Sequence, residues 1–391
     1  MACHERCPLN PQRGFPTEEF FERTRRCQEQ MAERQIAAIM LCTEPEVRYF
    51  TGFHTPFWQS PTRPWFTVIP AAGKPIAVIP SIGGESMGQT WIEDVRTWSS
   101  PRPDDDGVTL LVECLRETAG SGKIGLTMGA ETHVRMPLRD LDRVRSMVGD
   151  FVDATDIIRG LRMVKSEREI DKLRHICAVV SDAFDELPNL LATGMTERQA
   201  FSAFRDELLR QGADDVPYLV GATGPDGVAD VIRQPTDRRI DDGDLLIFDT
   251  GSTFDGYFSD FDRNFAFTTA GKGARDAYRA VWEATEAGLE AVRPGAATSE
   301  VFTAMNKVLM ANGSLGNDIG RMGHGLGMQV TEWPSNAADD HTVIEPNMVL
   351  TLEPALMWEP GKAMVHEENL VVRADGAELL SRRAAPELPV I

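Results

Sequence analysis

The sequence predicts a two-domain protein of the α/β (α+β) class, with an α/β domain over residues 1–158 and a pseudo-symmetric domain over residues 159–391. Three observations lead to this prediction. Helix-like and strand-like runs alternate through the first domain, a strong helix start falls near residue 166, and the chain beyond it contains an internal duplication. The length of 391 residues also fits two or three domains of about 150 residues each.

The composition argues against several kinds of partner. The chain has 40 basic and 60 acidic residues, and its formal net charge of −20 would repel nucleic acids and anionic membrane surfaces. With 42% hydrophobic and 26% charged residues, it has the composition of a chain that buries a core. No apolar run has the length of a membrane span or a signal peptide, and the six cysteines include no Cys-x-x-Cys pair. We therefore expect a cytoplasmic protein with no nucleic-acid or membrane partner.

The first domain is predicted from elements that alternate along the chain. A polar helix with an apolar stripe spans residues 16–35, and a strand follows at 36–42. The later elements are a turn-rich stretch at 48–66, strands at 66–71 and 75–80, a Pro/Asp-rich loop at 100–107, a helix at 109–120 ended by Gly120, and a strand at 124–128. This order predicts a sheet with helices packed against it.

The second domain is predicted to begin with a long helix. Ser166 and Glu169 have the spacing of a capping box, in which each side chain accepts a hydrogen bond from the other residue's backbone N–H. Apolar residues then recur at helical spacing: Ile170, Leu173, Cys177, Val180, Phe184 and Leu187. We therefore expect the domain boundary just before this helix.

An internal duplication runs through the second domain. An offset of 101 residues aligns Gly194 with Gly295, Phe201 with Phe302, Ala203 with Ala304, Leu208 with Leu309 and Gly212 with Gly313. At an offset of 104, GDLLIFD (243–249) matches NMVLTLE (347–353), and each segment ends in an acid. Two similar half-domains would place Asp249 and Glu353 symmetrically about one centre.

Two acids in the first half are predicted to share a site. Asp249 follows an apolar run typical of a strand buried on both faces, where a charged carboxylate requires a cation. Asp260 lies further along the chain, and Gly251 together with the Asp255-Gly256 pair predicts a hairpin turn between the two acids. Asp249 and Asp260 would then lie on adjacent antiparallel strands.

The second half supplies three more candidate ligands. Glu353 ends one apolar run, Glu367 precedes another, and His324 lies in GHGLG (323–327), where glycines allow close approach to a ligand. Each acid alone could equally be a surface or ion-paired residue. Together, four carboxylates and one imidazole carry too much negative charge for one divalent ion and suit a pair bridged by carboxylates and a hydroxide. The predicted metal ligands are Asp249, Asp260, His324, Glu353 and Glu367.

These motifs together resemble the pita-bread-fold metallopeptidase family, which includes Xaa-Pro dipeptidase, aminopeptidase P, methionine aminopeptidase and creatinase. The resemblance covers nearly the whole chain. It rests on RYFTGF (48–53), VKSEREI (164–170), DTG (249–251), GYFSDFDR (256–263), GHGLG (323–327), TLEP (351–354) and HEEN (366–369). It implies a creatinase-like N-terminal α/β domain, a pita-bread catalytic domain and two divalent ions, with manganese, iron, zinc and cobalt all left open.

The chain departs from the family pattern in the residues that hold the substrate. The family's peptidases usually carry a histidine seven residues after the ligand histidine, and this chain has Thr331 there. A second substrate histidine is also missing from VIRQPTD (231–237), and an arginine common before the last glutamate is replaced by Val365-His366. Thr331, Arg233 and His366 are the residues expected to substitute. Each lost donor to a developing oxyanion is worth about 10²–10³ in rate, so ordinary Xaa-Pro cleavage is expected to be weak.

The resemblance implies a dinuclear hydrolase of a C–N bond, an amide or an Xaa-Pro-like bond, acting through a metal-bridging hydroxide. Glu353 resembles the family carboxylate that moves the proton from water to the leaving amine. Two alternatives remain. One is a non-hydrolytic lyase on the same scaffold, similar to dimethylsulfoniopropionate lyase in the tripeptide at 332–334, although Thr331 replaces the acid that serves as the base there. The other is a catalytically silent binding protein.

Aromatic and basic residues near the proposed site are candidate contacts for a small-molecule or short-peptide substrate. Trp58 and Trp333 could enclose a methylated cation, although tryptophans at such positions are more often core or interface residues. Arg63 lies in a Pro-Thr-Arg-Pro turn and Arg233 in the segment without its histidine. Because the resemblance implies a homodimer, Trp58 and Arg63 are expected to reach the site from a neighbouring subunit.

Overall fold

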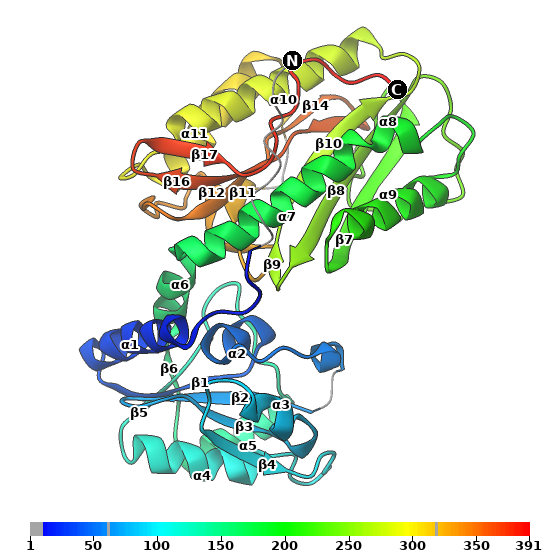
Figure 1. Cartoon of the computed structure of the whole chain (residues 1–391). Coiled ribbons are helices and arrows are strands. Elements are labelled where there is room, and N and C mark those ends of the chain that lie inside the picture. Colours follow the sequence, from blue (N-terminus) through cyan, green and yellow to red (C-terminus); the bar gives the residue numbers. More distant parts are fainter. Residues whose placement is uncertain (1–10, 61–62, 317–319) are drawn as a thin grey trace. The chain divides into compact units, whose positions relative to one another are not determined.

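The computed structural model describes residues 11–60, 63–316 and 320–391 (Figure 1). Two compact units divide the chain between Arg162 and Met163, at the end of helix α6 (Thr155–Met163). The sequence places this boundary slightly earlier, between residues 158 and 159. The metal ligands predicted from the sequence all belong to the second unit.

The first unit is built on one six-stranded sheet with the order β4-β3-β2-β1-β5-β6. Its strands are β1 (Ile36–Leu41), β2 (Phe66–Pro70), β3 (Ile76–Pro80), β4 (Asp94–Trp98), β5 (Lys123–Leu126) and β6 (Val152–Asp153). Its helices before α6 are α1 (Thr17–Glu33), α2 (Glu44–Thr51), α3 (Gly84–Gly88), α4 (Val108–Ala119) and α5 (Leu138–Val148), with short 3₁₀ turns at Pro56–Gln59 and Ser81–Gly83. The predicted helices and strands of this unit are confirmed, except that the stretch predicted as turns from residue 48 begins inside α2.

Both faces of this sheet are covered, because side chains alternate along its strands. Val68 and Val78 pack with α4 and α5 on one face. Ala77 and Ile79 pack on the other face, in a core that also includes Phe20 of α1. The unit is therefore a three-layer α/β/α arrangement, as the alternation of elements predicts.

The second unit contains four long helices and one short one. They are α7 (Glu167–Asp185), α8 (Leu187–Leu190), α9 (Glu197–Gln211), α10 (Lys272–Ala291) and α11 (Thr298–Ala311). The predicted capping box begins α7: the Ser166 backbone N–H donates to Glu169 at 2.9 Å, and the Glu169 N–H donates to the Ser166 hydroxyl at 3.3 Å. This local pattern sets the start of the unit's first helix.

Strands from both halves of the second unit form two main sheets. The first has the order β10-β8-β7 with β9 beside β8: β7 (Asp215–Pro225), β8 (Asp244–Phe254), β9 (Tyr257–Phe258) and β10 (Phe261–Ala266). The second has the order β12-β11-β13-β16-β17: β11 (Arg321–Gly325), β12 (Glu332–Ala337), β13 (Val349–Leu352), β16 (Glu368–Arg373) and β17 (Gly376–Leu379). A separate pair joins β14 (Ala355–Glu359) and β15 (Lys362–Val365).

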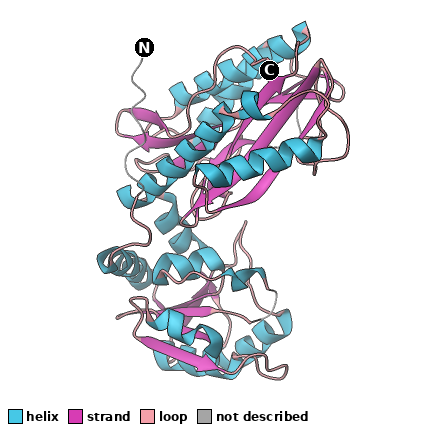
Figure 2. Ribbon diagram, turned by 45° about the vertical axis from the view of Figure 1, so that its right-hand side comes forward, coloured by secondary structure: helices cyan, strands magenta, loops and turns pink. Residues whose placement is uncertain are grey.

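The helices cover these sheets in two matching layers. Figure 2 shows helices running along the strands of this unit. Helices α7 and α9 pack on β8 and β7, and α10 and α11 pack on the strands of the second half. In the first half Phe204 stacks on Phe248 at 5.0 Å between ring centroids, which fixes α9 against β8. This arrangement is the predicted pita-bread fold.

Backbone contacts confirm the predicted duplication. Gly194 and Gly295 both have positive φ, +88° and +87°, and each donates its N–H to the segment that precedes a later strand, β8 or β13, to Ile240 O at 2.8 Å and to Ile344 O at 2.9 Å. A second equivalent pair is Gly221 and Gly323, whose added Cβ atoms would lie only 1.9 and 2.1 Å from carbonyl oxygens of the neighbouring strands. The two halves therefore share a backbone framework as well as a sequence pattern.

Two further observations concern the rest of the described chain. Within residues 11–60, 63–316 and 320–391, no helix combines the length and apolarity needed to cross a membrane. The described cysteines, Cys27, Cys42, Cys114 and Cys177, are buried free thiols. Cys3 and Cys7 lie outside the described residues.

Candidate metal centre

Asp249 lies in the middle of the central strand β8, where the surrounding residues are buried. Tyr218 of β7 donates its hydroxyl to Asp249 Oδ2 at 2.7 Å. The other carboxylate oxygen, Oδ1, is buried and has no hydrogen-bond partner within the described structure. Asp249 is therefore oriented through one oxygen and leaves the other for a ligand that the protein does not supply.

Asp260 comes directly before β10 and is reached through the predicted hairpin turn. Asp255 and Gly256 both have positive φ, +47° and +76°, and connect β8 to β9. The Asp260 backbone is fixed by the Asn369 side chain, which accepts from its N–H at 2.9 Å and donates to its carbonyl. This clamp holds the Asp260 carboxylate near His324, with 3.4 Å between Oδ2 and Nε2.

His324 lies on β11 in a backbone that requires glycine on either side. A side chain at Gly323 would collide with Thr351 O, and one at Gly325 would lie 1.9 Å from Trp333 O. The His324 Nδ1 lies 2.9 Å from Gly325 O, and a carbonyl oxygen can only accept. Nδ1 therefore carries the proton, and Nε2 presents its lone pair to the acids, as a metal ligand requires.

Glu353 and Glu367 complete the cluster from the ends of β13 and β16. The Glu353 Oε1 lies 4.0 Å from His324 Nε2, and its backbone N–H donates to Met322 O at 3.2 Å. Glu367 Oε1 is buried without a partner in the described structure, and its backbone carbonyl accepts from Arg263 at 2.9 Å. Both acids are thus positioned through their backbones while their carboxylates face the cluster.

The structure brings the five predicted ligands together. Ligand atoms of Asp260, His324 and Glu367 all lie within 4.8 Å of one another. Burial, followed by the charge of Asp260, raises the pKa of Asp249 to about 7, and burial raises the pKa of Glu353 to about 7. Burial also raises the pKa values of Asp260 and Glu367 well above their ordinary range. Crowded acids of this kind are stable when ionised only beside cations, and carboxylates with one imidazole suit divalent metals.

Arg321 also lies beside the cluster, although no pattern in the sequence predicted it. Its Nε lies 3.8 Å from Glu353 Oε1, and its NH2 lies 3.5 Å from the Thr331 hydroxyl. Thr331 was predicted as a substitute for the missing histidine, and the structure adds a guanidinium beside it. The signal in the sequence is only position: Arg321 lies three residues before His324, on the same strand.

Two other expected substitutes are held by other parts of the unit. Arg233 donates to Glu197 Oε1 at 2.6 Å and to the Thr223 carbonyl at 3.5 Å. Since Glu197 is fully buried, this placement favours a role for Arg233 in fixing its loop over direct contact with a substrate.

His366 faces helix α10. Its Nδ1 lies 3.2 Å from the Thr285 hydroxyl, and Arg383 approaches its Nε2 at 3.1 Å. Burial and the nearby guanidinium groups of Arg263 and Arg383 outweigh the charge of Glu368 and lower the pKa of His366 to about 3. His366 is therefore a neutral, buried residue that lies among Thr285, Arg383 and Glu368.

The aromatic and basic residues that were predicted as substrate contacts lie in both units. Trp333 is 9% exposed and belongs to the core of the second unit, beside the buried ion pair of Lys165 and Glu332 at 3.2 Å. Trp58 belongs to the core of the first unit, and Arg63 lies over the Phe57 ring there. Both tryptophans thus have the buried character that the sequence analysis gave as the alternative to a substrate contact.

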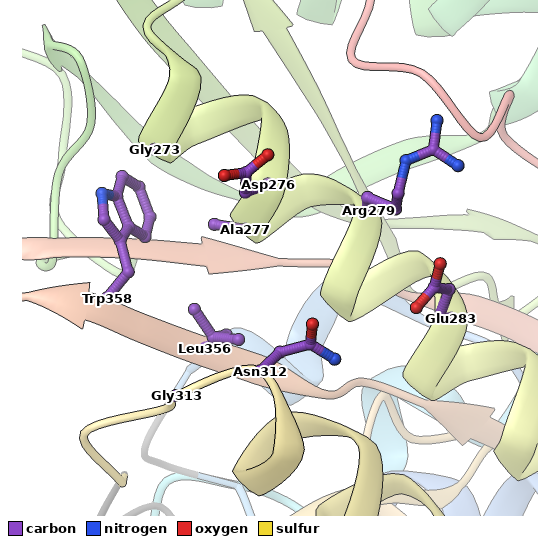
Figure 3. Close-up of a pocket in the computed structure, with 9 residues that line it drawn as sticks. All are labelled: Gly273, Asp276, Ala277, Arg279, Glu283, Asn312, Gly313, Leu356 and Trp358. Atoms are coloured by element: carbon purple, nitrogen blue, oxygen red, sulfur yellow. The ribbon is translucent and has the colours of Figure 1, made fainter.

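A separate pocket of about 420 Å³ lies beside helix α10 (Figure 3). In Figure 3, Asp276, Arg279 and Glu283 project from this helix, Trp358 comes from β14, and Asn312 follows α11. None of the five predicted ligands lines this pocket. Asp276 and Arg279 form surface ion pairs with Lys272 and Glu387, and the metal-ligand group found among the described residues lies elsewhere.

Comparison with known proteins agrees with this geometry. Residues 171–374 match the model of metallopeptidase family M24, and residues 23–164 match the creatinase/prolidase N-terminal domain. A Mycobacterium tuberculosis protein described as a probable dipeptidase PepE is 27% identical over 380 residues, which cover 97% of this chain and 98% of that protein. An Xaa-Pro dipeptidase from Pyrococcus furiosus is 26% identical over 262 residues, covering 66% of this chain and 74% of that protein.

Solved structures show the same likeness. The dipeptidase PepE from Mycobacterium ulcerans has a TM-score of 0.84 at 27% identity and covers 96% of this chain and 99% of its own. A prolidase from Thermococcus sibiricus has a TM-score of 0.86 at 22% identity, with 96% and 100% covered, which shows the likeness of fold. The family match spans more than half of the chain and contains all five predicted ligands. The chain therefore belongs to metallopeptidase family M24 and is a metal-dependent hydrolase with a creatinase-type N-terminal domain.

Proposed function

We propose that this chain hydrolyses a C–N bond of a small amide or an atypical dipeptide, with two divalent metal ions held by the five-residue cluster. The observation that carries this proposal is the convergence of four carboxylates and one imidazole from both halves of the second unit. The unpartnered oxygens of Asp249 and Glu367 support it, because buried carboxylate oxygens require a partner. The relatives named as dipeptidases support a peptide-like substrate.

The ions would polarise the substrate carbonyl and lower the pKa of a bound water. Glu353 supplies the proton transfer in this proposal: its carboxylate is 24% exposed and lies at the open side of the cluster. Its Oε1 would take a proton from the attacking water and deliver it to the leaving nitrogen. Asp249, oriented by Tyr218, and His324, oriented by Gly325, hold fixed ligand atoms during this exchange.

Thr331 and Arg321 hold the substrate carbonyl in this proposal. Both are partly exposed, and their polar atoms lie 3.5 Å apart beside Glu353. Arg233 and His366 do not contact the substrate in this proposal, since Arg233 is paired with Glu197 and His366 contacts Thr285. The proposed homodimer, in which Arg63 would reach a neighbouring site, is tested by the mass of the purified protein in solution.

Elemental analysis and substrate profiling of gently purified protein test the proposal. We expect two divalent ions for each chain, activation by added manganese, and turnover of small amides that exceeds turnover of Gly-Pro and Ala-Pro. Trace metal only, with no gain on adding manganese, would overturn the dinuclear centre. Robust Gly-Pro cleavage would instead show an ordinary Xaa-Pro dipeptidase.

A further inference from the structure

Asp262 is a further acid of the second unit that lies next to the predicted ligands. It is 1% exposed and lies directly opposite Asp249 in the antiparallel pairing of β10 with β8. Opposed residues of such a pair project from the same face of the sheet, with Cβ atoms about 4.5–5.5 Å apart. Two like charges in this arrangement are destabilising unless a cation lies between or beside them.

The two carboxylate oxygens of Asp262 have different surroundings. Oδ1 accepts the backbone N–H of Glu367 at 3.2 Å, so Asp262 is also tied to a second predicted ligand. Oδ2 is buried and has no hydrogen-bond partner in the described part of the chain. A buried carboxylate oxygen without a partner carries a desolvation cost that a bound cation would remove.

The nearest guanidinium is engaged elsewhere. Arg263 donates to the backbone carbonyls of Asp262, Glu367 and Arg382 and to Glu368 Oε2, at 2.6 to 3.0 Å. The Arg263 guanidinium thus donates to three backbone carbonyls and to a different carboxylate. Asp262 Oδ2 is not among the acceptors, so this arginine does not satisfy it.

We propose that Asp262 is a fifth carboxylate of the metal centre, which contributes Oδ2 to a divalent cation beside Asp249 and Glu367. This inference rests on the proposed function, because it assumes that the five-residue cluster binds metal. An added carboxylate oxygen favours hard ions, so Asp262 also raises the preference for manganese over zinc.

Asp262→Asn tests this inference in the full-length protein, with manganese chloride alone as the probe. The amide keeps an oxygen for the Glu367 N–H and removes the charge and the second carboxylate oxygen. We expect titration calorimetry to show one of two manganese ions bound at least about 10-fold more weakly than in the unchanged protein. Asp244→Asn is the matched control: Asp244 is equally buried on β8, is paired with Arg238, and should leave manganese affinity unchanged if the fold is intact.

The possible results separate the two proposals. If the unchanged protein binds two manganese ions and Asp262→Asn binds them with equal affinity, Asp262 only supports the Glu367 backbone and the inference is wrong. If the unchanged protein binds no manganese, both proposals are overturned. Asp262→Glu covers the case in which the asparagine variant does not fold. The extra methylene group moves the carboxylate oxygen, so weaker binding of one manganese ion supports the inference, and affinity equal to that of the unchanged protein contradicts it.

Discussion

Arg321 lies between Glu353, a predicted metal ligand, and Thr331, the residue predicted to replace a substrate histidine. Its guanidinium lies beside Glu353 and Thr331, where it would face the oxygen of a substrate carbonyl. A planar guanidinium offers several fixed donors to such an oxygen, whereas a lysine ammonium offers a single mobile charge. The side chain at position 321 should therefore influence the rate through the transition state more than through folding.

Arg321→Met is expected to lower kcat/KM by about 10²–10³ on the best substrate of the unchanged protein, because a donor to the developing oxyanion is lost. Arg321→Lys should recover part of this loss. Steady-state kinetics measures kcat/KM of each variant, and the manganese bound by each variant is measured in parallel. Arg233→Met, which removes an arginine held by Glu197, is the matched control and should reduce stability more than kcat/KM. Unchanged kcat/KM in Arg321→Met would show that Arg321 does not contact the substrate.

The candidate metal ligands that the structure brings together were predictable from the sequence, and the residues that orient them were not. The predicted ligands are acids at the ends of apolar runs and a histidine between glycines, which are signals carried by a few neighbouring residues. Tyr218 reaches Asp249 from the neighbouring strand, and Asn369 reaches Asp260 from the other sheet, so both contacts join residues that are distant in the sequence. Such partners depend on register, which a single sequence does not display.

At the scale of elements, Glu197 fixes the beginning of α9 to the loop that carries Arg233. Its carboxylate accepts from the backbone N–H groups of Thr223 at 3.0 Å and Thr236 at 2.9 Å, as well as from both hydroxyls. Burial alone would raise the pKa of Glu197, but these hydrogen bonds outweigh it and lower the pKa below its ordinary value of 4.5. The loop is thus tied to the helix by an ionised carboxylate.

Glu197→Gln is expected to lower the free energy of unfolding by about 1–3 kcal/mol at neutral pH, because an amide cannot accept all of these bonds. A lowered folded-state pKa contributes stability above the unfolded value of 4.5, which is lost as the pH falls through the folded-state pKa. The difference between the variant and the unchanged protein should therefore shrink in acid. Urea unfolding of both proteins, at neutral pH and at a pH below the folded-state pKa of Glu197, measures this difference in the free energy of unfolding. The exposed pair of Lys272 and Asp276 supplies the control: Asp276→Asn should change stability by less than about 1 kcal/mol.

The elements that were predicted well have strong local signals. The capping box and helical stripe set the start of α7, and Gly120 ends α4 with its N–H bonded to Arg116 O at 2.9 Å. The stretch at 48–66 was predicted as turn-rich. It begins inside α2, where Thr43 and Glu46 cap the helix start.

At the scale of the whole molecule, the acids that produce the net charge of −20 fall into two groups. Most acids lie on the surface and keep the protein dispersed. A few converge in the second unit, where both half-domains contribute acids to one cluster. The strand order β4-β3-β2-β1-β5-β6 and the division of the second unit into separate sheets depend on long-range pairing, and composition and periodicity do not determine them.

Removal of the metal ions is expected to destabilise the protein in a pH-dependent way. In the metal-free state Asp249 and Glu353 have pKa values raised to about 7. A carboxyl group with a raised folded-state pKa contributes stability at low pH that is lost as the pH rises from about 4 through about 7. The metal-free protein should therefore be more stable at about pH 5.5 than at about pH 8.

Manganese should reverse this trend, because it binds the ionised acids of the folded state. An ion present at about 100 times its dissociation constant adds about 2.7 kcal/mol of stability. Scanning calorimetry after chelation, with and without added manganese at both pH values, measures the effect. The double variant Asp249→Asn/Glu367→Gln should gain nothing from manganese and should lose less stability as the pH rises, because it lacks two of the mutually repelling acids. A metal-free protein that is equally stable at both pH values and insensitive to manganese would show that this cluster is not a metal centre.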